Sequence, residues 1–195
     1  IMVMNADLQS IEQLYRFDLV PEVYSLDFLR QYIVPGKQMG MERFPVHIKV
    51  DTGMARLGWD WEHPQDLISF LNDHPGVEVQ SVLSHLSSAD DAALNAFSRT
   101  QAERFLHFYA RLTSEVAFEQ PPLRHICNTA GVLRFPEYAF DMVRLGIGLY
   151  GIPPFEDANI DLQEIGSLHT VITQIHEYPA NTPIGYGCSD RTSTT

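Results

Sequence analysis

The sequence has few basic residues, few cysteines and no long apolar run, and each shortage excludes a class of protein. Its 195 residues include 13 Lys and Arg against 25 Asp and Glu, a formal net charge of -12 at pH 7. Nucleic acids and anionic membranes bind basic surfaces, so we expect neither as a partner. No apolar stretch approaches the roughly 20 residues that cross a bilayer. The two cysteines, Cys127 and Cys188, form no CxxC pattern, so we predict no disulfide framework, no metal site and a reducing, cytoplasmic setting.

What remains is the composition of a globular protein, with 45% hydrophobic residues. The chain begins Ile-Met-Val-Met-Asn, with no charged segment ahead of an apolar run. We therefore predict no signal peptide.

Short apolar runs alternate with helical patterns, which predicts βα units and a parallel sheet, an α/β fold. The expected strands cover residues 1–5, 21–25, 44–53, 77–86, 124–128 and 140–151. The expected helices cover residues 8–19, 26–33 and 64–74, and a long one follows residue 88, with Leu94, Phe97, Gln101, Phe105, Phe108 and Leu112 on one side.

Polar side chains stand at the carboxyl ends of four expected strands: Lys49, His85, Asn128 and Arg144. Both a (β/α)8 barrel and a doubly wound sheet place ligands at this edge, and periodicity alone does not separate the two. Six units are too few to close an eight-stranded barrel, which typically needs about 250 residues.

Prolines 153 and 154 mark a change of composition, and we predict a domain boundary there. Residues 1–152 form the βα domain, 153–166 a linker and 167–195 the start of a β-rich domain. Within the last, residues 167–179 and 181–188 are expected to be extended.

The segment VHIKVDTGMARLGW, residues 46–59, places Lys49 on a buried strand and Arg56 in the following loop. A buried ammonium group is costly unless it is paired. Lys49 could pair with a carboxylate such as Asp51, or it could build an anion site with Arg56. His85 could be structural, or it could stack on or bond to a cofactor ring.

Arg144 is the least expected residue of the chain, because it lies in an apolar run just before Gly146. A buried guanidinium must meet an acceptor. A heteroaromatic nitrogen of a ligand would serve, and so would a distant carboxylate. Thr129, Gly146 and Ile147 offer a hydroxyl and backbone N–H groups where phosphates dock in barrels, although both segments could be ordinary turns.

Four segments taken together resemble alanine racemase, a fold-type III enzyme that uses pyridoxal 5'-phosphate. They are HIKVDTGMARLGW, SHLSSADD, RHICNTAGVLRFPEYAFDMVRLGIGLYGIPP and TPIGYGC, in the family's order. The resemblance implies a (β/α)8 barrel of the TIM type followed by a β-rich C-terminal domain. It implies racemisation of alanine or a similar small amino acid, for cell-wall precursor supply in a bacterial cytoplasm.

The resemblance also implies roles around the cofactor. Arg144 matches the arginine that hydrogen-bonds the pyridine nitrogen, and His85 the histidine that bonds this arginine. Asn128 matches a residue that contacts the ring. Thr129 stands where the family usually has serine and keeps the phosphate-binding hydroxyl. Backbone phosphate contacts match Gly146 and Ile147, and an apolar cofactor contact matches Met4.

Three more matches concern the substrate. Arg56 matches the arginine that faces the substrate carboxylate and the ring oxygen. Lys49 matches a lysine that is carbamylated in several members and would then hold Arg56. Tyr186, otherwise a plain hairpin residue, matches the catalytic tyrosine, a base on one face of the α-carbon. In the family this tyrosine reaches the other subunit's site, which implies a homodimer with shared active sites.

One family feature has no counterpart. The Schiff-base lysine lies in a KANAYGHG-like segment, and the only lysines here are Lys37 and Lys49. We therefore interpret the chain as an internal fragment with about six of eight βα units, expected to be inactive alone.

Two alternatives stay open. The chain could be a non-catalytic barrel module that binds pyridoxal phosphate, which Arg56 and Tyr186 disfavour. It could also be a piece that folds only in an assembly, because an open barrel exposes two strand edges.

Overall fold

The computed structural model describes residues 1–193. Backbone contacts divide the chain into two units, Ile1–Glu164 and Ile165–Thr195. Within the described part of the chain, no helix combines the length and the apolar character that crossing a membrane requires.

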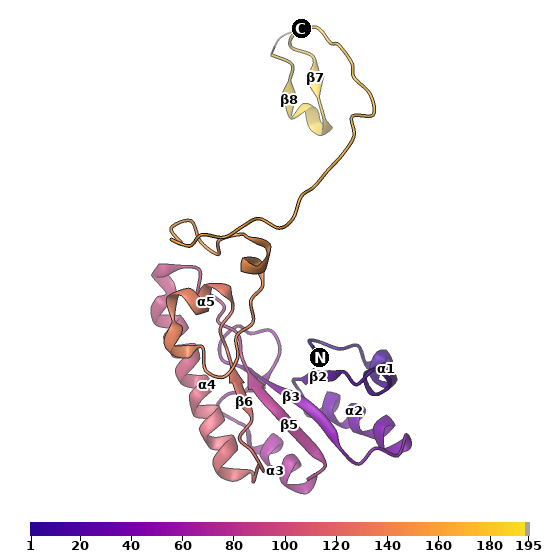
Figure 1. The fold of residues 1–195 in the computed structure, drawn as a ribbon, viewed down its shortest axis with the longest axis vertical. Helices are drawn as coiled ribbons and strands as arrows, with labels where there is room; N and C mark the ends of the chain where they lie inside the picture. The colour runs from indigo at the N-terminus through magenta and orange to yellow at the C-terminus, as the bar shows by residue number, and fades with distance from the viewer. Residues whose placement is uncertain (194–195) are drawn as a thin grey trace. The chain divides into compact units, whose positions relative to one another are not determined.

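A parallel sheet forms the centre of the first unit and runs in the order β1-β2-β3-β5-β6, with the short β4 paired to β3 (Figure 1). The α/β class expected from the sequence is thereby confirmed. The strands are β1 Met2–Val3, β2 Val20–Val23, β3 Phe44–Asp51, β4 Trp59–Asp60, β5 Val77–Leu83 and β6 Leu123–His125.

Helices follow most strands and bury one apolar side each. Leu29, Leu67 and Phe105 are fully buried, in one core cluster with Ile48 and Val82 of the strands. The α-helices are α1 Ile11–Arg16, α2 Leu26–Gln38, α3 Gln65–Asp73, α4 Asn95–Glu115 and α5 Thr129–Arg134. The 3-10 helices are η1 Leu8–Ser10, η2 Ala92–Leu94, η3 Pro136–Tyr138 and η4 Ile147–Tyr150.

The long helix α4 runs beside β5 and β6 (Figure 1). Its buried side contains Gln101, Phe105, Phe108 and Leu112, as the spacing predicted. The prediction that Leu94 lies on the buried side was wrong, because Leu94 belongs to η2 and is 43% exposed.

The strand expected over residues 140–151 is wrong. Phe140 has φ of 45°, and the described backbone continues as turns into η4. Two backbone N–H groups still reach back to β6 and the residues after it: Asp141 donates to the Arg124 carbonyl and Arg144 to that of Cys127. The segment therefore lies beside the sheet without forming a regular ladder, because a left-handed residue breaks the extended repeat.

The second unit contains one antiparallel hairpin, β7 Pro183–Ile184 with β8 Asp190–Arg191, and the 3-10 helix η5 Tyr186–Cys188 between them. The expected extended segment 167–179 forms no strand in the described structure. Its apolar side chains are open to solvent, with Leu168 100% and Ile172 80% exposed. An isolated stretch of alternating pattern is not stable as a strand without a neighbour to accept its hydrogen bonds.

Candidate functional site

The polar residues predicted at the strand ends do gather in the first unit. A register shift between Val46 and His47 in β3 places His47 beside Ser81 and Lys49 beside Leu83, and β6 places His125 beside Leu83. Residues aligned across parallel strands point to the same face of a sheet. Bulges of this kind often occur near functional sites, where they redirect side chains.

Lys49 is buried and forms an ion pair with Glu22 of β2, with Nζ 2.5 Å from Oε1. Sequence reasoning anticipated a carboxylate partner but suggested Asp51. The Asp51 carboxylate instead accepts the backbone N–H groups of Gly53 to Arg56 and so closes the loop. Glu22 is fully buried, and neither of its oxygens has an aligned hydrogen-bond partner among the described residues, so its compensation is the charge of Lys49.

Arg144 is held by four acceptors from neighbouring strand ends. Its Nη1 donates to His125 Nδ1 at 2.6 Å and to the His125 carbonyl at 3.1 Å. Its Nη2 donates to the Ser84 carbonyl at 2.5 Å and approaches His85 Nδ1 at 3.4 Å. Burial lowers the pKa of Arg144 to about 10, against the opposing effect of the Glu22 charge, so the guanidinium stays protonated at neutral pH. Its Nε–H has no acceptor within residues 1–193.

His85 lies beside Arg144, and the charges of Arg56 and Lys49 also act on it. Burial lowers its pKa to about 4, and the charges of Arg144, Arg56 and Lys49 add to this effect. The ring is therefore neutral at pH 7. Its second nitrogen lies 3.5 Å from Asn128 Nδ2, whose amide orientation is set by donation to the Leu86 carbonyl.

Three further residues of the site were missed: His125, Ser81 and His47. His125 is fully buried and contacts Arg144, and Ser81 connects it to His47. A signal existed, because His47 and Lys49 alternate along one strand and so share a face. His125 occupies the last position of β6, and polar residues at strand ends were the ones predicted to form the site.

Thr129 and the glycines after Arg144 form a small polar cradle. Thr129 Oγ1 accepts the backbone N–H of Gly146 at 3.1 Å and that of Gly148 at 3.4 Å. A Cβ at Gly148 would lie 2.6 Å from Thr129 Cγ2, so this close approach requires glycine. A Cβ at Gly146 would meet no atom within 4 Å, which leaves room beside its N–H. Ile147, the predicted contact between them, is 47% exposed.

The remaining predicted residues are less constrained. The Arg56 side chain is exposed, and Met4, just after β1, is 45% exposed. Tyr186 belongs to the second unit, where its side chain is fully exposed in η5.

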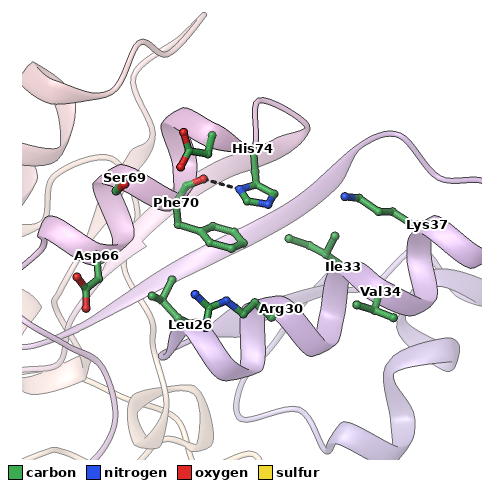
Figure 2. Close-up of a pocket in the computed structure, with 10 residues that line it drawn as sticks. Leu26, Arg30, Ile33, Val34, Lys37, Asp66, Ser69, Phe70 and His74 are labelled. Carbon is green, nitrogen blue, oxygen red and sulfur yellow. Dashed lines mark hydrogen bonds between the residues drawn. The ribbon is translucent and has the colours of Figure 1, made fainter.

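A separate groove of about 640 Å³ lies between α2 and α3 (Figure 2). His74 stacks on Phe70 there, with the ring centroids 4.0 Å apart, and Lys37 and Arg30 line the opposite side. Of the predicted site residues described above, none lines this groove, so it is distinct from the strand-end site.

The family model for the N-terminal domain of alanine racemase matches residues 1–154. This match covers the whole strand-end site, from β1 to the cradle. The chain belongs to the alanine racemase family.

Individual members of the family agree with this assignment. Alanine racemase from Syntrophobacter fumaroxidans is 32% identical over 187 residues, which cover 95% of this chain and 48% of the relative. The alanine racemase of Bacillus anthracis, solved with bound L-Ala-P, superposes with a TM-score of 0.80 at 25% identity over 99% of this chain and 51% of that one. That of Bartonella henselae, solved with covalently bound pyridoxal phosphate, gives 0.76 at 25% identity over 100% and 52%.

These alanine racemase structures establish the barrel type of fold that the resemblance implied. The chain spans about half the length of the relatives that it matches.

Proposed function

We propose that the chain is part of a pyridoxal-phosphate-dependent racemase that interconverts L- and D-alanine. One observation carries the proposal. The half-buried side chain of Arg144 is fixed by strand-end acceptors, and its Nε–H has no protein acceptor among residues 1–193, two residues before the cradle at Gly146.

The residues present fit a pyridine ring that bears a phosphate. Arg144 Nε–H would donate to the ring nitrogen, and Asn128 and His85 would lie against the ring. The Thr129 hydroxyl proton and the N–H of Ile147 would hold the phosphate, because backbone N–H groups of such turns favour anions. The N–H of Gly146, which donates to Thr129 Oγ1 in this structure, would join them by turning toward the phosphate. Net charge supports the same view, since the site gathers cations in a chain that is acidic overall.

Bound pyridoxal phosphate would supply an electron sink for the amino acid's α-carbon. Arg144 would set how strong that sink is. An arginine does not give up its proton at working pH, and burial lowers the pKa of Arg144 only to about 10. It would therefore leave the ring nitrogen of the bound cofactor unprotonated, which would suit the exchange of a single proton at the α-carbon.

Substrate handling is assigned to residues outside the buried network. Arg56 would bind the substrate carboxylate. Lys49 is paired with Glu22, so the two charges cancel and add no net charge near Arg56. Tyr186 would remove or return a proton on one face of the α-carbon. Its full exposure accords with a residue that serves a second copy of the chain, and we propose a homodimer with shared sites.

Neither lysine is placed to bind the cofactor covalently. Lys49 forms an ion pair with Glu22, and Lys37 lies on α2 at the groove between α2 and α3. We expect the isolated chain to bind pyridoxal phosphate reversibly and to turn over no alanine.

The test is a chimera in which this chain replaces the matching stretch of the Syntrophobacter fumaroxidans relative, which keeps its own remaining residues. We expect it to convert L-alanine to D-alanine, measured by chiral chromatography, and Arg144→Met to reduce the rate at least tenfold. The matched control is Arg134→Met, which removes an arginine that contacts Phe155 instead of the site. A folded chimera that binds pyridoxal phosphate but racemises nothing, beside an active parent, would support a non-catalytic binding module instead.

A further inference from the structure

A chain of hydrogen bonds runs across the sheet from Arg144 to β3, part-buried at Arg144 and buried from His125 onward. His125 Nδ1 meets Arg144 Nη1 at 2.6 Å, His125 Nε2 meets Ser81 Oγ at 2.8 Å, and Ser81 Oγ meets His47 Nδ1 at 2.7 Å. Ser81 and His125 have no exposed surface, and His47 is 8% exposed. None of the last three belongs to the site as the sequence predicted it.

The direction of every proton in this chain follows from its charged end. A guanidinium only donates, so His125 Nδ1 must accept and a neutral His125 must carry its proton on Nε2. That proton is donated to Ser81 Oγ. The single Ser81 hydroxyl proton is then free to be donated to His47 Nδ1 when His47 carries its own proton on Nε2.

Both imidazoles are neutral at working pH, as this scheme requires. Burial lowers the pKa of His125 to about 3, and the positive charge of Arg144 adds to the effect. Burial likewise lowers the pKa of His47 to about 4. Each nitrogen of His125 is therefore used once, one as acceptor and one as donor.

We propose that Ser81 and His47 are positioning residues, which hold His125 in the one tautomer that can accept from Arg144. Without Ser81, the Nε2–H of His125 would be a buried donor without an acceptor, a state that proteins avoid. The ring would then tilt or admit water, and Arg144 would lose its shortest side-chain contact. The relay thus fixes where the free Nε–H of Arg144 points.

The inference builds on the role proposed for Arg144, but its first test needs no cofactor. Nitrogen-15 NMR of the full chain, labelled at histidine, should show His125 protonated on Nε2 and bare on Nδ1. In Ser81→Ala the Nε2 proton should exchange with solvent at least tenfold faster. Ser81→Thr, which restores a hydroxyl, should return the slow exchange. Ser98→Ala is the matched control, because Ser98 is also fully buried but its hydroxyl has no hydrogen-bond partner among residues 1–193.

The second readout is the affinity for pyridoxal phosphate, followed by its absorbance. We expect Ser81→Ala and His47→Leu to weaken binding about tenfold, the loss of one buried hydrogen bond. His47→Asn, which keeps an acceptor near the position of Nδ1, should bind like the native chain.

The results distinguish failure of the proposed hydrogen-bond relay from failure of the proposed function. A native His125 with its proton on Nδ1 overturns the relay, and so does a Ser98→Ala variant that changes exchange as much as Ser81→Ala. A native chain that binds no pyridoxal phosphate overturns the proposed function, while the NMR result still decides the relay. If a Ser81 variant fails to fold, the native tautomer and the two His47 variants decide it.

Discussion

The ion pair between Glu22 and Lys49 allows a test of how much a buried pair of charges contributes to the stability of the fold. The two charged atoms lie 2.5 Å apart, and the side chains are 0% and 6% exposed. At an effective dielectric constant of about 20, their attraction is about 7 kcal/mol. Removing both groups from water costs several kcal/mol per ion, so the pair as a whole adds little net stability.

Breaking the pair is different from replacing it. Glu22→Gln leaves the ammonium of Lys49 buried and unpaired, and we expect the free energy of unfolding to fall by about 3–5 kcal/mol. The double variant Glu22→Leu with Lys49→Met removes both charges and fills the space, and it should lie within about 1 kcal/mol of the native chain or above it. Urea unfolding followed by circular dichroism measures both. A Glu22→Gln variant as stable as the native chain, or a double variant as unstable as the single one, would refute the reasoning.

Three further predictions follow from packing and from titration. Gly148→Ala should cost about 1–3 kcal/mol of unfolding free energy because its methyl meets Thr129 Cγ2, and adding Thr129→Ser should recover most of the loss in the same urea assay. Leu67→Ala, at a fully buried core position, should lower the stability by about 2–5 kcal/mol, measured by thermal unfolding. His47 and His125 have lowered pKa values of about 4 and 3, so their contribution is complete above pH 6.5 and is lost as pH falls toward 4. At about 1.4 kcal/mol per pKa unit, the shift of His47 corresponds to about 3 kcal/mol and that of His125 to about 5 kcal/mol, and a chain as stable at pH 4.5 as at pH 7 would contradict this sign.

Much of the first unit could be predicted from local pattern. The run around β3 is apolar and ends in Asp-Thr-Gly, and the spacing in α4 marks a buried stripe, so both elements form where expected. Lys49, His85, Asn128 and Arg144 were predicted because they are polar where a parallel sheet carries its ligands, and His85 does lie beside Asn128 and Arg144. These predictions succeed because the hydrophobic period alone determines which face is buried.

The failures have one cause: they depend on neighbours that a local pattern does not reveal. Residues 140–151 are apolar enough for a strand, yet Phe140 takes a left-handed φ and the segment closes over β6 instead. Residues 167–179 alternate like a strand but have no partner in the described structure. Glu22 was not predicted for the same reason, because its partner Lys49 lies in the neighbouring strand. A residue's partner across the sheet is set by register, which the bulge after Val46 shifts.

His47 and His125 are buried and His85 is half-buried, and the lowered pKa values of all three keep them neutral near pH 7. Because His47, His85 and His125 take up no proton until about pH 4 or below, a ligand beside Arg144 meets the same protein charges at pH 6 as at pH 8. Any change in binding over that interval must then originate in the ionisation of the ligand itself or of a group farther away. The pH dependence of ligand binding between pH 6 and 8 would therefore report the pKa values of the ligand's own groups.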